Sequence, residues 1–222
     1  MRAVPYIALL TATIMAITVQ VDARSKDYFD EDERTFRGGL AAGLNFSQVD
    51  GDRYFGYNKA GLHLGGFVQM RLGQQIRLQM EILYTQKGSH GFAVAETPIA
   101  GTQVSLCHIG LSYTEVPVVV QYQRGRMMAE AGAAWAYLLR TNEWILEPQA
   151  LYIDATGNRF NNTDVNCVLG VARKFNQRWL VNARFQYSLA AIRPPERVPV
   201  GYGYGTQGQF NNMLTVRVLY TL

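Results

Sequence analysis

The sequence is poor in cysteine, in charge and in long blocks of one charge sign. Two cysteines in 222 residues cannot build a disulfide framework or a four-thiolate metal site, and we expect neither a metal nor another cofactor. Charged residues make up 17% of the chain, and 21 Lys and Arg against 17 Asp and Glu give a net charge of +4 without the basic blocks of nucleic-acid-binding proteins. Apolar residues make up 48%, with 21 Gly, 13 Tyr and 10 Phe, a mixture that favours many short strands. We therefore expect an all-β protein that does not bind nucleic acid.

The first segment has the pattern of a signal peptide. Arg2 is followed by an uncharged, largely apolar stretch that reaches Val21, and the small residue Ala23 stands at a suitable cleavage position. Residues 1–23 are therefore predicted to be a cleaved signal peptide. An uncleaved anchor is the alternative, since roughly 18 uncharged residues just suffice to span a bilayer. Residues 24–35 would then form an acidic periplasmic tail with five carboxylates.

Beyond residue 35, apolar and polar side chains alternate with the period of a β-strand. In the segment 76–85 one parity is apolar and the other is polar or charged, with Leu83 as the exception. Phe67 is a similar misfit in an earlier segment. No uncharged run here approaches the length of a membrane-spanning helix, so any membrane insertion must use strands. The alternation occurs in eight segments: residues 36–47, 62–72, 76–85, 111–122, 126–139, 164–175, 179–189 and 214–222.

The connections between these segments alternate between short and long. The tight turns are at residues 73–74, 123–125 and 176–177. The longer links are residues 48–61, 88–103, 140–163 and 190–209. An even number of strands in this arrangement predicts an eight-stranded antiparallel up-and-down transmembrane β-barrel over residues 36–222, placed in the cell outer membrane. The short turns would face the periplasm and the long loops the outside.

A water-soluble barrel of lipocalin type is the rival architecture, because it shows the same alternation with the apolar side chains inside. The polar parity decides between the two. It combines glycines such as Gly43 and Gly170 with arginines and glutamates, which would make a poor apolar ligand cavity but a good narrow, charge-paired lumen. We therefore expect the apolar parity to face lipid and the charged parity to face the lumen.

Six charged residues on the polar parity are predicted to form a lumen network. Eight strands leave an interior that side chains must fill, and buried ions must be paired, so a structural plug is favoured. A gated ion path through the same residues is the alternative. The predicted members are Arg77, Glu81, Glu115, Glu130, Arg184 and Arg217.

Three further features bear on the strands and on chemistry. Pro117 lacks a backbone donor inside a predicted strand, so a strand bulge is expected there. Cys107 and Cys167 lie on non-adjacent strands, and either free thiols or a bridge across the lumen is compatible with the sequence. The three histidines lie far apart, and no cluster of nucleophile, base and orienting acid is visible in the alternation, so no catalytic residue is predicted.

Four segments together resemble a known family. They are residues 43–47 (GLNFS), 56–63 (GYNKAGLH), 78–88 (LQMEILYTQKG) and 113–117 (YTEVP). They resemble the PorT-like outer-membrane β-barrel family of Bacteroidetes, and the resemblance runs from about residue 36 to the end. The chain departs from the usual barrel pattern in ending on Leu222 rather than on an aromatic residue. The resemblance implies an outer-membrane barrel, in a family with one member linked to type IX secretion of proteases and most members without an assigned activity.

These observations lead to one functional expectation and two alternatives. We expect a non-enzymatic outer-membrane barrel, structural or secretion-associated, whose long extracellular loops contact partners. A small pore or transporter is the first alternative, and a lipid-modifying membrane-barrel enzyme is the second. The expected partners are outer-membrane lipid and secretion-machinery or other envelope proteins. The loop 190–209 combines prolines with alternating Gly and Tyr, which is compatible with a contact surface or with an ordinary solvated loop.

Overall fold

The structure, a computed structural model, describes residues 35–52, 54–97, 101–146, 159–198 and 207–222. The predicted signal peptide, residues 1–23, and all but the last residue of the acidic tail lie outside the described residues. In the described part of the chain, no helix has both the length and the apolar character needed to cross a membrane.

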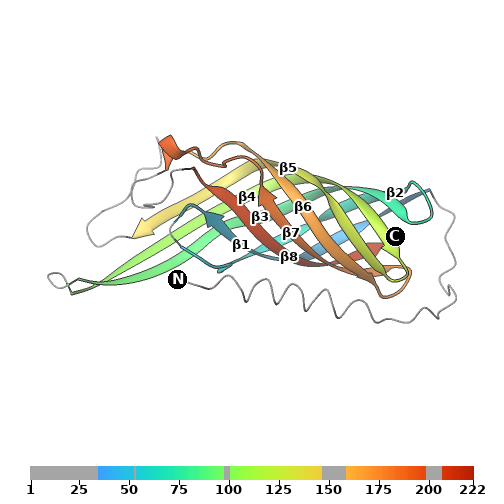
Figure 1. The fold of residues 1–222 in the computed structure, drawn as a ribbon, viewed down its shortest axis with the longest axis horizontal. Coiled ribbons are helices and arrows are strands. Elements are labelled where there is room, and N and C mark those ends of the chain that lie inside the picture. Colours follow the sequence, from blue (N-terminus) through green and yellow to red (C-terminus); the bar gives the residue numbers. More distant parts are fainter. Residues whose placement is uncertain (1–34, 53, 98–100, 147–158, 199–206) are drawn as a thin grey trace. The chain divides into compact units, whose positions relative to one another are not determined.

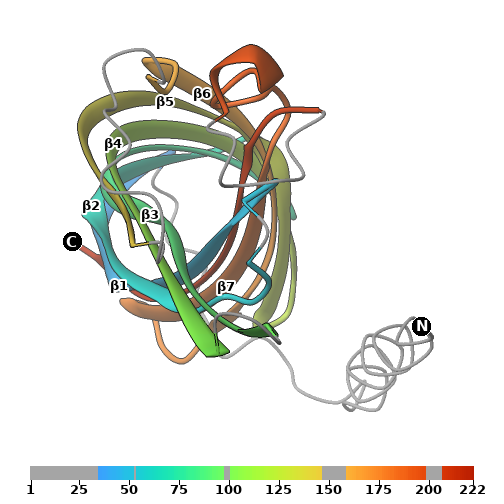
Figure 2. The ribbon, with the colours of Figure 1, turned by 90° about the vertical axis from the view of Figure 1, so that its left-hand side faces the viewer.

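Eight antiparallel strands close into a single barrel (Figure 1). Each strand pairs with the next along the chain, and the last strand pairs with the first, from Gly39 opposite Thr221 to Asp50 opposite Phe210. Figure 2, which looks along the barrel, shows the strands as a ring. The predicted fold class is confirmed. The strands are β1 (Phe36–Asp50), β2 (Lys59–Arg71), β3 (Ile76–Thr97), β4 (Gly101–Arg124), β5 (Met127–Leu146), β6 (Thr163–Lys174), β7 (Trp179–Ser188) and β8 (Phe210–Thr221), with a short 3-10 helix η1 (Pro195–Arg197) before β8.

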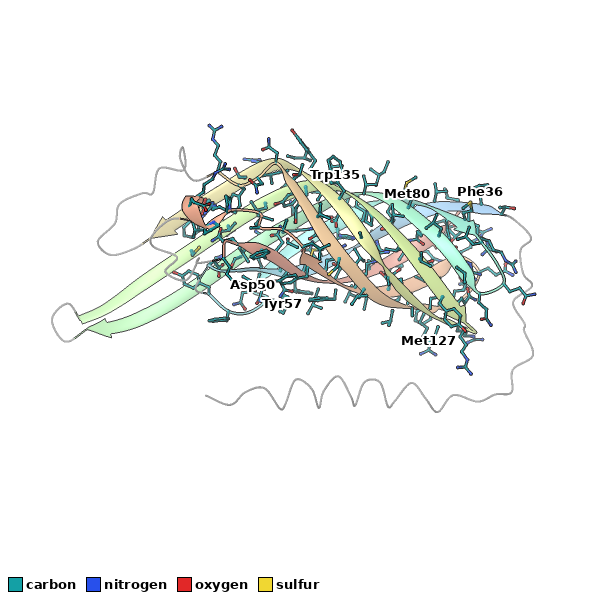
Figure 3. All side chains as sticks on the ribbon, turned by 45° about the horizontal axis from the view of Figure 1, so that its top comes forward. Phe36, Asp50, Tyr57, Met80, Met127 and Trp135 are labelled. Atoms are coloured by element: carbon teal, nitrogen blue, oxygen red, sulfur yellow. The ribbon has the colours of Figure 1, made fainter. Side chains whose placement is uncertain are left out.

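The apolar parity faces outward and the charged parity faces inward, as the sequence predicts. Ile82 is 66% exposed, whereas its neighbour Glu81 is 1% exposed. Met80 and Trp135 likewise project from the outer face (Figure 3). This orientation contradicts the lipocalin-type alternative, because a soluble barrel would bury its apolar side chains inside. An apolar outer surface closed without strand edges is the arrangement that lipid requires.

The two misfits of the alternation, Phe67 and Leu83, also point inward. They pack with Ala41 and Leu219 into a small buried apolar cluster, against which Leu180 also packs. Phe67 and Leu83 therefore face the lumen like the polar residues of the same parity, although they are apolar. They place an apolar layer in the half of the barrel nearer the short turns.

The predicted loop 88–103 is wrong, because β3 continues to Thr97 and β4 already begins at Gly101. The two strands stay paired throughout this region, and β4 also pairs with β5 as far as Leu106 opposite Leu146. Gly88 permits this continuation, since its φ of +135° suits glycine and an added Cβ would collide with the Ile109 carbonyl oxygen. Glycines and polar residues in this stretch indicate a loop by composition, but the ladder between β3 and β4 satisfies the backbone.

The bulge predicted at Pro117 is also wrong. Pro117 lies opposite Ala134 in regular register with β5, and the β3–β4 register is the same on both sides of it. The missing donor therefore interrupts the ladder without inserting a residue. The register shift in β4–β5 falls between Ser112 and Tyr113, where the partner jumps from Arg140 to Leu138.

Candidate functional site

The six predicted lumen residues come from five strands, and the structure places them at three levels. Five of the six are almost fully buried, and Arg77 is half-buried at the end of the barrel that carries the short turns. The inner tier contains Glu81, Glu130, Arg184 and Arg217, the outer tier contains Glu115, and Arg77 stands at the short-turn mouth.

The inner tier is a compact network of two carboxylates and two guanidinium groups. Arg217 donates to both oxygens of Glu81, at 2.5 and 2.9 Å, and Arg184 donates to the same two oxygens at 2.6 and 3.2 Å. Arg184 also donates to both oxygens of Glu130. The charges balance, and no buried polar atom of these four side chains lacks a hydrogen-bond partner. Such charge-assisted, bidentate contacts compensate for the cost of burying the ions.

Neutral side chains complete the inner tier. Glu130 accepts hydrogen bonds from Gln121 at 3.0 Å and from Asn182 at 2.9 Å. Asn182 in turn accepts one from Arg217 at 2.7 Å. These neutral groups join the charged side chains across β4, β5, β7 and β8, which fixes the side-chain positions.

Glycines on the polar parity make room for this network. Gly170 lies between Glu130 and Arg184 in the row of paired residues across β5, β6 and β7. A Cβ at Gly170 would lie 2.5 Å from Glu130 Oε1 and 2.9 Å from Arg184 Cγ. Gly43 plays the same part beside Arg217, with which it is directly paired. The glycines therefore set where the long charged side chains can cross the lumen.

The outer tier lies farther from the short turns and centres on Lys87. Its ammonium group lies 3.7 Å from Glu115 Oε1 and 3.7 Å from Asp164 Oδ2, and it donates to Asn166 Oδ1 at 3.2 Å. Asn211 Nδ2 donates to Asp164 Oδ2 at 2.8 Å. Lys87, Glu115, Asp164, Asn166, Asn211 and the hydroxyl of Tyr113 make up the outer tier, and all are buried.

The sequence analysis did not identify Lys87, the positively charged side chain of the outer tier. Lys87 falls in the alternation if the third segment is extended two residues beyond Thr85, but the neighbouring glycine indicates a loop there. Asp164 is on the polar parity of the sixth segment, and only the fold brings it beside Lys87. Tyr113 is buried in the lumen, because β4 places it on the same face as Glu115.

The short-turn mouth is narrow. Arg77 donates a hydrogen bond to Gln123 and lines a recess together with Arg37 and Phe67. The recess has a volume of about 20 Å³, which is room for about one water molecule. With the arginines of the inner tier fully buried behind it, the lumen is filled with side chains at this level. This arrangement favours the predicted plug over an open path.

The reactive side chains described in the lumen are buried. Thr85 Oγ1 lies 3.1 Å from His63 Nδ1, a hydroxyl and imidazole pair, but both side chains are fully buried. In the described ranges, no group of three or more His, Cys, Asp or Glu residues is arranged to hold a metal ion. Cys107 points inward and is buried, Cys167 lies on the outward parity, and the two are not joined by a disulfide.

Beyond the barrel proper, β3, β4 and β5 form a three-stranded extension. The pairing of β3 with β2 ends at Thr85, and that of β5 with β6 ends at Tyr137, whereas pairing within the three strands continues (Figure 1). We call residues 89–97, 101–111 and 141–146 the extension. On it, Trp144 stacks on His108 with ring centroids 5.5 Å apart, and Trp144 is 40% exposed.

Comparisons with known proteins agree with a membrane barrel. The family model described as the outer membrane protein beta-barrel domain matches residues 20–192, more than three quarters of the chain. No curated protein matches the sequence at a significant level.

Several solved structures are similar in chain path. The attachment invasion locus protein Ail of Yersinia pestis is 12% identical, with 85% of this chain and 100% of that chain covered and a TM-score of 0.46. The N-terminal β-barrel domain of Pseudomonas aeruginosa OprF is 12% identical, with coverages of 85% and 98% and a TM-score of 0.37. Neisserial surface protein A is 9% identical, with the same coverages and a TM-score of 0.40. The fold assignment stands on the strand pairing and on the family model rather than on these similarities.

Proposed function

The chain belongs to the outer membrane protein beta-barrel domain family, and from that premise we propose that it is a non-enzymatic barrel of the outer membrane that carries a rigid sheet for contact with a protein partner. The observation that carries the proposal is the extension, in which three strands continue past the closed barrel. The short turns face the periplasm in this proposal, so the extension lies outside the cell.

The filled lumen supports a scaffold rather than a conduit. The inner tier joins β3, β5, β7 and β8 through buried, charge-balanced hydrogen bonds. Such a network holds the strands at fixed positions, and the extension continues β3 and β5 directly. The partner surface is therefore presented by the rigid part of the molecule.

The edges of the extension offer a specific mode of contact. Past Thr85, β3 has no ladder partner on its β2 side among the described residues. On the β6 side of β5, the Leu138 amide still donates to the Asn162 carbonyl oxygen at 2.8 Å, and past Leu138 no ladder partner follows among the described residues. A strand edge presents a row of backbone donors and acceptors to which an extended segment of another protein can add. The exposed Trp144 adds an aromatic anchor next to the β5 edge.

The motif resemblance adds the partner class. Segments such as GLNFS at residues 43–47 resemble the PorT-like family of Bacteroidetes, so we propose secretion machinery or another envelope protein as the partner, with outer-membrane lipid around the barrel. The absence of enzymatic activity is part of the same proposal, because the Thr85–His63 pair is sealed in the lumen. Purified protein incubated with lipid A should leave the lipid unchanged in mass.

Site-specific crosslinking in intact cells tests the partner surface. A photoreactive residue at Asn142, on the β5 edge of the extension, should give a discrete crosslinked product, and Trp144→Ala should reduce it several-fold. The matched control places the photoreactive residue at Val68, which is 50% exposed on the barrel wall and should react with lipid only. Equal protein crosslinking at both positions, or none at position 142, would contradict the proposal.

A further inference from the structure

The two tiers of the lumen differ in charge balance. The inner tier pairs two arginines with two glutamates. The outer tier sets one ammonium group, on Lys87, against two carboxylates, on Glu115 and Asp164. With both carboxylates ionised, the outer tier carries one uncompensated negative charge in a buried site, which is costly unless a positive charge joins it.

The two tiers also differ in hydrogen bonding. In the outer tier, both carboxylate oxygens of Glu115, Oδ1 of Asp164 and Oδ1 of Asn211 have no hydrogen-bond partner, and all four atoms are buried. Asn166 Nδ2 is the single unpartnered donor in the tier. Four acceptors against one donor is an excess of oxygen lone pairs at one place in the lumen.

Lys87 does not resolve this excess. Its two carboxylate contacts, at 3.7 Å, are longer than a hydrogen bond, and its short contact is with Asn166 at 3.2 Å. The side chain of Asn211 is 1% exposed and reaches Asp164 through its amide nitrogen, while its amide oxygen is buried and has no hydrogen-bond partner. This neutral, buried acceptor is independent of the carboxylate charges and points to the same missing species.

We propose that the outer tier binds one monovalent alkali cation, Na⁺ or K⁺, through oxygens of Glu115, Asp164 and Asn211. One positive charge neutralises the tier, whereas a divalent ion would leave it positive beside Lys87. Carboxylate and amide oxygens are the ligands that hard cations prefer. The ion enters during folding, because its ligand oxygens are buried in the folded chain and the inner tier closes the lumen on the short-turn side. This inference is independent of the partner proposed for the extension.

Thermal unfolding in different salts tests the proposal. The full chain is refolded into zwitterionic detergent micelles at one ionic strength, in NaCl, in KCl or in N-methyl-D-glucamine chloride, whose cation is too large for the site. Because the folded state alone binds the ion, the Tm should be higher by about 3 °C or more in at least one alkali salt. Equilibrium binding of ²²Na⁺ or ⁸⁶Rb⁺ should give one ion per chain.

Three variants give the test its controls. Asp164→Asn should abolish the dependence of Tm on the cation and the bound ion, and Glu115→Gln serves the same purpose if Asp164→Asn does not fold. Glu196→Gln, which removes an exposed carboxylate on η1, should keep both. An identical Tm in all three salts would overturn the proposal. So would a Tm that is independent of the cation but rises more on acidification in the parent chain than in Asp164→Asn, since a proton would then neutralise the tier.

Discussion

Arg217 on β8 donates two hydrogen bonds to the carboxylate of Glu81 on β3, at 2.5 and 2.9 Å, across 136 positions of sequence. Strands β1 and β2 lie between β8 and β3 in the barrel, so the pair joins strands that are not neighbours. Arg184 on β7 donates to the same carboxylate, so Glu81 links β3 to both β7 and β8. The energetics of the barrel should depend strongly on this residue.

Removal of the Glu81 carboxylate should be severely destabilising. Glu81→Ala leaves two buried guanidinium groups without their main acceptor, and breaking a buried pair in this way costs about 3–5 kcal/mol of unfolding free energy. Urea-induced unfolding of the refolded protein measures the loss. The control Glu196→Ala, at an exposed site, should stay within about 0.5 kcal/mol of the parent. Similar losses in the two variants would show that the inner tier does not stabilise the fold.

A closed lumen predicts that the protein does not conduct ions. In planar lipid bilayers, the refolded chain should give no discrete current steps, because Arg184 and Arg217 fill the inner tier. Arg184→Gly combined with Arg217→Gly removes both long side chains and should, if the barrel still folds, admit a small current. Discrete channels in the parent protein would revive the pore alternative.

Substitution of Gly132 should disturb the barrel wall. A Cβ there would collide with the backbone carbonyl oxygen of Val118 on the neighbouring strand, which cannot move without breaking the ladder. Gly132→Ala should therefore destabilise by about 1–3 kcal/mol or prevent folding, seen as loss of the heat-modifiable band on gels. Gly73→Ala, in a turn with nothing within 4 Å of the added Cβ, is the matched control and should leave mobility unchanged.

Arginine on the outer wall should reveal where the lipid lies. Ile82 is 66% exposed near the middle of the barrel part of β3, so Ile82→Arg should cost about 2–4 kcal/mol in lipid vesicles. Leu72, at the turn after β2, is 55% exposed at the edge of the wall, and Leu72→Arg should cost about 0–1 kcal/mol. A protein in which both changes are neutral, and which stays soluble without detergent, would not be a membrane barrel.

The loop between β1 and β2 should make stability depend on pH. Burial raises the pKa of Asp52 from an ordinary 3.8 to about 6, although hydrogen bonds from Ser89 and the Tyr54 backbone oppose the rise. The folded state therefore binds more protons than the unfolded state between about pH 4 and 6, so stability falls as pH rises through this window. The full loss, at most about 3 kcal/mol, applies above pH 6.

Asp52→Asn should remove this decline, while Glu196→Gln should preserve it. Urea unfolding between pH 4 and 8 provides the measurement. A parent chain whose stability is flat or rises across that window would contradict the assigned burial of Asp52.

Sequence periodicity and turn length determined the number of strands and their order, as segment 76–85 and the turn 73–74 show. The charged and glycine-rich composition of the polar parity determined which parity faces outward. Periodicity also placed six charged residues on one face. It did not determine which of them meet, because the height of a residue in the lumen depends on the register between strands and on the strand tilt that closure imposes.

Three features depend on the tertiary structure rather than on the local sequence pattern. The tertiary structure separated Glu115 from Glu81 and gave it Lys87 and Asp164 as neighbours. It kept Pro117 in register opposite Ala134 and put the register shift of this ladder between Ser112 and Tyr113. It also extended β3 and β4 past the barrel, since their pairing with each other satisfies the backbone where the composition indicates a loop. Local pattern therefore specified the wall of the barrel, and long-range register specified what the wall encloses and what projects from it.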